Sequence, residues 1–188
     1  MKPTFLLTIM ACLMTLFTTH ASNNNDQEMN NNSKTLVAYF SATGTTMEAA
    51  TRLAKAARAD LHEIVPEVPY TPADLNWRDS SSRSSLEMKD KSSRPAIAGK
   101  VENMAQYDTV FVGYPIWWYI APTIINTFLE QYDLSGKTIV PFFTSGGSGA
   151  GETMRYLKPS APDAHWVEPK NFNYMTEADV KKWIETLR

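Results

Sequence analysis

The sequence predicts an α/β fold in which a parallel β-sheet is covered by helices on both faces. The first observation is a continuously apolar run at 36–40, which is typical of a parallel strand buried on both sides. The second is the alternation of such runs with segments whose apolar residues recur at helical spacing. Alternating strands and helices form βαβ units with right-handed crossovers. The length of 188 residues suits one domain with a sizeable core.

The first half of the predicted sheet consists of strands at 36–40, 60–66 and 109–114. A helix is expected between the first two, with its apolar residues on one face: Met47, Ala50, Leu53, Ala54 and Ala57. After the third strand, Pro122 suits the first position of a helix. The buried stripe of that helix is expected to be Ile124, Ile125, Phe128 and Leu129.

The second half of the sheet is expected to contain strands at 137–143 and 164–167, with a short helix at 150–157 between them. Pro141 has no N–H group, so we expect regular pairing of the fourth strand to be disturbed there. Thr176 and Asp179 resemble a capping box with Asp in place of Glu. They introduce an amphipathic helix whose apolar residues are Ala178, Val180, Trp183, Ile184 and Leu187.

The turn at 41–46, Ser-Ala-Thr-Gly-Thr-Thr, joins the first strand to the first helix and carries four hydroxyls and no charge. A strand, a short turn and a helix point free backbone N–H groups at an anion, and the helix dipole adds to their attraction. The turn lacks the Gly-Lys-Ser/Thr ending of a Walker A loop and the three glycines of the dinucleotide fingerprint. It therefore predicts a phosphate site built from N–H and O–H groups.

Three segments together resemble the cofactor loops of the flavodoxin family. The turn at 41–46 is similar to the family's phosphate loop, T-x-T-G-x-T, with Ser41 in place of the first Thr. The segments 113–119 and 143–148 are similar to the two loops that hold the flavin ring. The resemblance covers residues 34–188 and implies a flavodoxin-like three-layer sandwich, with a five-stranded parallel sheet ordered 2-1-3-4-5 and helices on both faces.

The resemblance also implies which residues bind the cofactor, FMN. The phosphate would be held by Ser41, Thr43, Gly44, Thr45 and Thr46. The ring would lie between one loop, Pro115, Ile116, Trp117 and Trp118, and a second loop, Thr144, Ser145, Gly146 and Gly147. The second loop has no aromatic residue, unlike that of many flavodoxins, so the outer face of the ring is expected to be open or covered by Trp77, Tyr70 or a partner.

Core packing is the alternative role for Trp117 and Trp118. Two adjacent tryptophans in a loop cannot easily face the same core, so we expect at least one of them at the flavin.

The function implied is that of an FMN-binding flavodoxin-like protein acting in electron transfer with a redox partner protein or a small-molecule acceptor. The loops at 114–122 and 144–148 are also similar to those of flavodoxin-like NAD(P)H:quinone reductases, so reduction of a quinone or another small molecule by NAD(P)H is the alternative. A non-catalytic binding module that has lost its flavin is a third possibility. No catalytic residue is assigned.

The segment 67–98 interrupts the strand–helix alternation with a long polar stretch rich in Ser, Pro and charge. Tyr70 and Trp77 indicate that part of it packs. It could be a flap near the flavin or its partner, or a surface excursion with one helical turn around Leu86. Its arginines, Arg78, Arg83 and Arg94, could bind an anionic substrate or could simply be solvated.

Other classes of function are disfavoured by the sequence. Ser148 with Asp163 and His165 faintly resembles a hydrolase triad, but Ala150 stands where the nucleophile elbow needs glycine, and the last two members are only two residues apart. His62 and His165 have no metal-ligand spacing, so no metal site is expected. A formal net charge of −2 offers no basic field for nucleic acid.

Residues 1–21 have the form of a signal peptide, with one Lys, a short apolar run and a cleavage site at Thr19-His20-Ala21. The run is too short for a comfortable membrane span, although an uncleaved anchor is the alternative. Lipoprotein processing at Cys12 is disfavoured because it would leave apolar residues on the product. Asn-rich residues 22–33 predict a disordered tether. We therefore expect an exported, periplasmic or extracellular protein whose domain spans 34–188 and which has no membrane span once the signal is removed.

Overall fold

The computed structural model describes residues 34–187, so the predicted signal peptide at 1–21 and tether at 22–33 lie outside the described residues. The elements in chain order are β1 (Lys34–Tyr39), α1 (Thr45–Ala57), β2 (Asp60–Glu63), β3 (Val65–Pro66), α2 (Arg83–Lys89), β4 (Ile97–Ala98), β5 (Tyr107–Pro115), α3 (Ile124–Glu130), β6 (Thr138–Thr144), α4 (Thr153–Leu157), β7 (His165–Trp166), β8 (Lys170–Asn171) and α5 (Glu177–Glu185). Single 3₁₀ turns lie at Met104–Gln106 and Lys158–Ser160.

The main sheet has the order β2-β1-β5-β6-β7, which is the predicted order 2-1-3-4-5. All of its strand pairs are parallel. The predicted number of five strands was wrong, because the sheet is six-stranded and β8 also pairs with β6. The edge position beside β6 is thus divided between two short strands.

The division lies opposite Pro141 of β6. On this edge β7 pairs with residues 138–139 and β8 with residues 142–143. The carbonyls of Ile139 and Phe143 accept hydrogen bonds from the edge at 2.9 and 2.8 Å. The backbone of Pro141 faces the same edge as those of Ile139 and Phe143, because alternate residues of a strand face the same side. Proline has no N–H group, so it cannot donate a hydrogen bond to this edge. The disturbed pairing predicted at this proline is confirmed on the outer side only, because the register between β5 and β6 is continuous.

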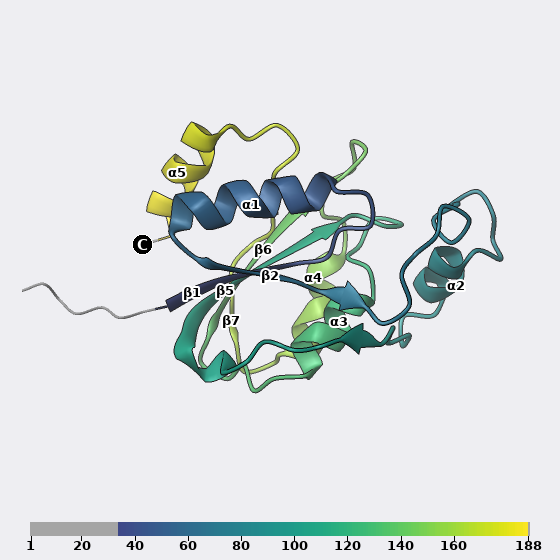
Figure 1. Cartoon of the computed structure of the whole chain (residues 1–188), viewed down its shortest axis with the longest axis horizontal. Helices are drawn as coiled ribbons and strands as arrows, with labels where there is room; N and C mark the ends of the chain where they lie inside the picture. The colour runs from purple at the N-terminus through teal and green to yellow at the C-terminus, as the bar shows by residue number, and fades with distance from the viewer. Residues whose placement is uncertain (1–33, 188) are drawn as a thin grey trace, which may run out of the picture. The chain divides into compact units, whose positions relative to one another are not determined.

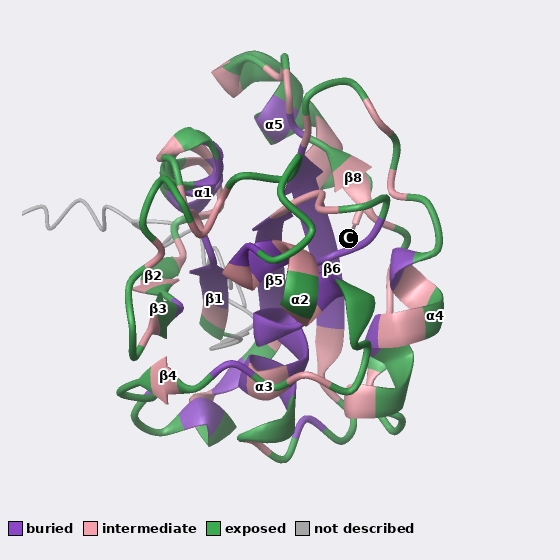
Figure 2. Ribbon diagram, turned by 90° about the vertical axis from the view of Figure 1, so that its right-hand side faces the viewer, coloured by how far each residue is buried: buried purple, intermediate pink, exposed green. Residues whose placement is uncertain are grey.

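Successive residues of the central strands face two opposite cores, which is why these strands are apolar throughout. On one face Val37 and Phe111 pack with Leu53 of α1 and Val180 of α5. On the other face the alternate strand residues pack with the apolar stripe of α3. Figure 1 shows α1 and α5 on one side of the sheet and α3 and α4 on the other, and Figure 2 shows buried residues concentrated in β1, β5 and β6. The three-layer architecture is therefore confirmed.

Several element boundaries differ from the prediction. The second strand leaves the main sheet at Glu63, and its last predicted residues form β3, which pairs antiparallel with β4. Pro122 precedes its helix, because Thr123 is the N-cap of α3. The helix predicted at 150–157 begins only at Thr153. Met47 is exposed, although the centre of its predicted stripe is buried.

The last helix, α5, starts as the sequence indicates. The Thr176 side chain accepts a hydrogen bond from the Asp179 N–H, and the Asp179 carboxylate accepts one from the Thr176 N–H. This reciprocal arrangement is a capping box, and it satisfies N–H groups that have no partner within the helix.

His62 of β2 is a titratable residue in a partly apolar environment. Its ring stacks on Phe128 with centroids 6.1 Å apart, and its Nε2 is buried without a hydrogen-bond partner among the described residues. Burial lowers the pKa of His62, although the charge of Glu63 acts in the opposite direction.

We expect this histidine to make the fold sensitive to mild acid. Because the pKa of His62 is lower in the folded state, the unfolded chain takes up the proton more readily. Its contribution to stability is complete above the unfolded pKa of about 6.5 and falls as the pH drops from there through the folded pKa. Urea denaturation of the wild type and of His62→Gln, at about pH 7 and about pH 5.5, measures the contribution. An equal loss of stability in both proteins would show that His62 is not responsible.

Candidate functional site

The three loops singled out in the sequence meet beyond the carboxyl ends of β1, β5 and β6. They enclose a cavity of about 640 Å³, which is within the range of about 300–1,000 Å³ typical of small-molecule sites. The predicted residues that line it are Ser41, Thr43, Thr45, Thr46, Pro115, Ile116, Trp117, Trp118, Thr144, Ser145 and Gly146. Gly44 and Gly147 do not line it. The further lining residues are Ala42, Leu75, Trp77, Ser84 and Tyr119.

The turn at 41–46 leads into α1 with Gly44 as N-cap, and no side chain among the described residues caps this end of the helix. The leading N–H groups of α1 are therefore left for a ligand, and the positive end of the helix dipole lies beside them. Gly44 has a φ of 91°, a left-handed conformation that glycine adopts without strain. Its N–H donates to the Ser41 hydroxyl at 3.1 Å, so Gly44 shapes the turn rather than lining the cavity.

Thr46 and Thr144 join the first loop to the third. Their hydroxyl oxygens are 2.8 Å apart, and both residues are buried. One hydroxyl of the pair must donate to the other, so only one proton of the two remains available to a ligand. The family resemblance implies that Thr46 binds the phosphate and Thr144 the flavin ring, whereas the structure places the two residues in contact.

The two adjacent tryptophans have different environments. Trp117 packs edge-on against Phe40 and Tyr70, with ring centroids 5.6 and 5.4 Å away. Trp118 is 40% exposed at the cavity. The prediction that the pair cannot share one core therefore agrees with the structure.

Trp118 and Tyr119 are the central residues of a tight turn, with φ values of 45° and 66°. The turn is closed by hydrogen bonds in both directions between the backbones of Trp117 and Ile120, at 2.9 and 3.1 Å. Bulky residues with positive φ cost about 1–3 kcal/mol each. Such strain persists only where the surrounding structure holds it, and here it sets Trp118 at the cavity and leaves Tyr119 71% exposed.

Gly151 supports this strained turn from the neighbouring loop. A Cβ at Gly151 would lie 2.1 Å from the carbonyl oxygen of Tyr119, and its φ is 52°. We expect Gly151→Ala to displace the turn and to lower the free energy of unfolding by about 1–3 kcal/mol, measured by urea denaturation. Gly136→Ala is the matched control, because Gly136 has a φ of 71° but open space around it. Equal losses in the two variants would mean that backbone strain, and not the contact with Tyr119, decides the effect.

The third loop is organised around Ser145 by a residue that the sequence analysis did not single out. The Ser145 N–H donates to the side chain of Asn173 at 2.7 Å, and the Ser145 hydroxyl donates to the carbonyl of Ser148 at 2.6 Å. Asn173 follows β8, and the pairing of this unpredicted strand with β6 places Asn173 beside Ser145. No local pattern in the sequence links two residues this far apart.

The segment 67–98 forms one wall of the cavity. It leaves the body of the fold through β3 and returns through β4, and between them it contributes Leu75, Trp77 and Ser84 to the lining. Its helix α2 lies beyond the ends of the strands in Figure 1 and in front of them in Figure 2. The segment therefore agrees in part with each of the two interpretations. It borders the cavity, as a flap would, and it contains one short helix around Leu86, as a surface excursion would.

Tyr70 anchors the beginning of this segment. Its ring packs on Phe40 and Trp117, its hydroxyl donates to the Glu87 carboxylate, and the Arg83 guanidinium lies 4.0 Å from its ring centroid. Burial raises the pKa of Tyr70, and the hydrogen bond and charge of Glu87 raise it further. Tyr70 is therefore a neutral donor that ties α2 to the first ring loop.

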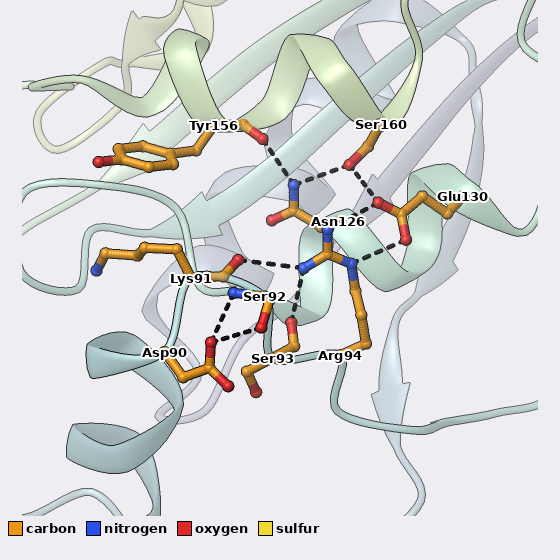
Figure 3. A network of polar contacts seen from close by, with 9 residues as sticks. All are labelled: Asp90, Lys91, Ser92, Ser93, Arg94, Asn126, Glu130, Tyr156 and Ser160. Carbon is orange, nitrogen blue, oxygen red and sulfur yellow. Dashed lines mark hydrogen bonds and ion pairs between the residues drawn. The ribbon is translucent and has the colours of Figure 1, made fainter.

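Arg94 anchors the end of the segment to α3, as Figure 3 shows. Its guanidinium donates to both carboxylate oxygens of Glu130, at 2.8 and 2.9 Å. Ser160 donates to the same carboxylate, and Asn126 donates to Ser160. The hydrogen bond from Arg94 is the main reason why the pKa of Glu130 is lowered. The two anchors fix the segment at both ends.

No charged side chain lines the described cavity. Of the arginines considered for anion binding, Arg83 pairs with Glu87 and Arg94 pairs with Glu130. Arg78 lies over Trp77, 5.0 Å from the ring centroid. An anion in the cavity would therefore be held by dipoles and hydroxyls.

The hydrolase alternative is excluded by the topology. His165 pairs with Thr138 at the start of β6, whereas Ser148 follows the end of that strand. Six residues of extended strand separate these two ends by about 20 Å.

Residues 34–187 contain no group of three or more His, Cys, Asp or Glu side chains placed to hold a metal ion. Within residues 34–187, no helix has the length and apolar character needed to cross a bilayer.

Comparisons with known proteins agree with this fold. The family model described as Flavodoxin matches residues 34–187. A candidate flavoprotein from Bacteroides eggerthii DSM 20697 is 53% identical, with a TM-score of 0.79 over 82% of this chain and 97% of that chain. A second, from Bacteroides uniformis ATCC 8492, is 48% identical, with a TM-score of 0.78 over 81% and 98%.

More distantly, a flavoprotein from Lactobacillus acidophilus NCFM in complex with FMN has the same fold. It is 22% identical, with a TM-score of 0.65 over 81% of this chain and 99% of that chain. No match was found among the curated proteins. The family model spans nearly all of the described residues, and the chain belongs to the flavodoxin family.

Proposed function

We propose that this protein binds FMN in the cavity and acts as an electron-transfer protein. The observation that carries the proposal is the N-terminus of α1, which opens onto the cavity through the hydroxyl-rich turn at 41–46. A phosphate there would accept charge-assisted hydrogen bonds from N–H and O–H groups, each contributing about 1.5–3 kcal/mol.

The residues present fit such a cofactor. The turn at 41–46 offers donors to the cavity, while Ile116, Trp118 and Leu75 and Trp77 of the segment 67–98 offer apolar walls. A ligand that combines a phosphate with a planar ring matches this combination of donors and apolar walls. The Lactobacillus acidophilus flavoprotein, which has the same fold, was crystallised in complex with FMN, and this supports the assignment.

The uncharged lining supports electron transfer over direct reduction by NAD(P)H. Bound FMN would supply the one-electron and two-electron chemistry. With no cation among the described lining residues, negative charge gained on reduction is not offset, and we expect a low reduction potential. The described lining residues also offer no cation to a nicotinamide dinucleotide.

The visible spectrum of the purified protein, before and after addition of FMN, tests cofactor binding. We expect a perturbed flavin spectrum and quenched flavin fluorescence at saturation. NAD(P)H added alone without oxygen then tests the role, and we expect the bound flavin to stay oxidised. Rapid bleaching by NAD(P)H, followed by reoxidation by a quinone, would replace electron transfer with the reductase alternative.

A further inference from the structure

The residue that carries a further inference is Ser84 of α2. It lines the cavity and is 2% exposed, and its hydroxyl has no hydrogen-bond partner among the described residues. A buried hydroxyl without a partner is costly, and native structures rarely keep one. A polar group that is buried, unsatisfied and adjacent to a cavity is placed for a ligand.

The position of Ser84 is held by contacts that do not use its hydroxyl. Its N–H donates to the carbonyl of Asp74 at 3.0 Å. Ser82 caps α2 by accepting a hydrogen bond from the Ser85 N–H. Glu87, one turn further on, receives the hydrogen bond from Tyr70. The backbone of Ser84 is therefore held in place before a ligand arrives, which lowers the entropic cost of binding.

The surroundings of Ser84 suit a ring rather than a phosphate. The other two lining residues from its segment, Leu75 and Trp77, are apolar. The turn at 41–46 already supplies the donors that a phosphate needs. A flavin ring has apolar faces and a polar edge of carbonyl and N–H groups, and a hydroxyl can donate to such an edge or accept from it.

We propose that Ser84 is a cofactor-binding residue that hydrogen-bonds the polar edge of the flavin ring, and that the segment 67–98 is an integral wall of the flavin site. This inference rests on the proposed function. It gives the segment a defined role, with Leu75 and Trp77 covering the ring and Ser84 orienting it.

Ser84→Ala distinguishes ligand binding from a purely structural role. Removing an unsatisfied buried hydroxyl should leave the melting temperature of the apoprotein unchanged or raise it. The dissociation constant for FMN should rise about three- to tenfold, the effect of one lost hydrogen bond. The reduction potential of the bound FMN should also shift, because the lost contact is to the ring.

Two matched variants complete the experiment. Ser85→Ala removes the neighbouring hydroxyl of α2, which bonds to Ser82 and does not line the cavity, so FMN affinity and potential should both stay the same. Thr43→Ala removes a hydroxyl from the phosphate turn, so affinity should fall while the potential stays the same.

An unchanged dissociation constant in Ser84→Ala would overturn the inference, because the hydroxyl would then make no contact with the bound cofactor. Weaker binding with an unchanged potential would also overturn it, because the contact would not be to the ring. Failure of the wild-type protein to bind FMN would instead remove the proposed function, and the inference with it.

Discussion

Gly113→Ala is expected to be the most destabilising single-methyl substitution in the central sheet. Gly113 lies in β5, and a Cβ there would fall 2.2 Å from the ring of Phe142 on the adjacent strand β6. That ring is fully buried and packs on Phe172, with centroids 4.9 Å apart, so it has no free space to enter. Overpacking of this kind costs about 1–3 kcal/mol and sometimes more. Because two central strands must part, we expect a loss of about 3 kcal/mol or more in urea denaturation.

Two further variants test this cause. Gly149→Ala adds the same methyl group where no described residue lies within 4 Å, and its stability should stay close to that of the wild type. Phe142→Leu shortens the obstructing side chain, so the double variant with Gly113→Ala should lose less than the sum of the two single losses. Additive losses would show that the contact between these two residues is not the source of the effect.

Thr45→Asp is expected to have the largest effect on the cofactor while sparing the fold. Thr45 is the first residue of α1, is exposed and lines the cavity. A carboxylate at this helix end should stabilise the apoprotein by about 0.3–1 kcal/mol. The same carboxylate would face the FMN phosphate, and like charges about 4 Å apart repel by about 4 kcal/mol near a protein surface. The affinity for FMN should therefore fall about a thousandfold.

The control for this variant is Thr51→Asp on the same helix. Thr51 is exposed, and its hydroxyl donates to the carbonyl of Met47 one turn earlier. Fluorescence titration with FMN and thermal denaturation of both variants separate binding from folding. If Thr45→Asp bound FMN as tightly as Thr51→Asp, the phosphate would not lie at the start of α1.

The features that the sequence predicted well are those set by local patterns. The apolar run at 36–40 and the turn at 41–46 lie next to each other in the chain, so their strand-to-helix geometry follows from neighbouring residues. The capping box of Thr176 and Asp179 spans one helical turn. The disturbed strand pairing at Pro141 could also be predicted, because it follows from the missing N–H group of a single residue.

The features that the sequence analysis missed depend on contacts between distant residues. Asn173 reaches Ser145 only because the short strand β8 pairs with β6. Arg94 meets Glu130 across 36 positions. These contacts carry no periodicity that could be read in advance.

The role of Ser84 was also hidden in the sequence, which shows it only as one serine among many in a polar segment. Its burial at the cavity follows from the packing of α2, which is anchored through Tyr70 to Phe40 and Trp117. Only the folded structure distinguishes it from the neighbouring Ser85.

The central claim is that the turn at 41–46 holds the phosphate of FMN, and paired titrations of the wild-type protein with FMN and riboflavin test it most directly. The two flavins share the ring and differ by the phosphate. Even two charge-assisted hydrogen bonds to the phosphate, each worth about 1.5–3 kcal/mol, predict that FMN binds at least about a hundredfold more tightly. Equal affinities for FMN and riboflavin would contradict the account, because the turn would then contribute nothing to phosphate binding.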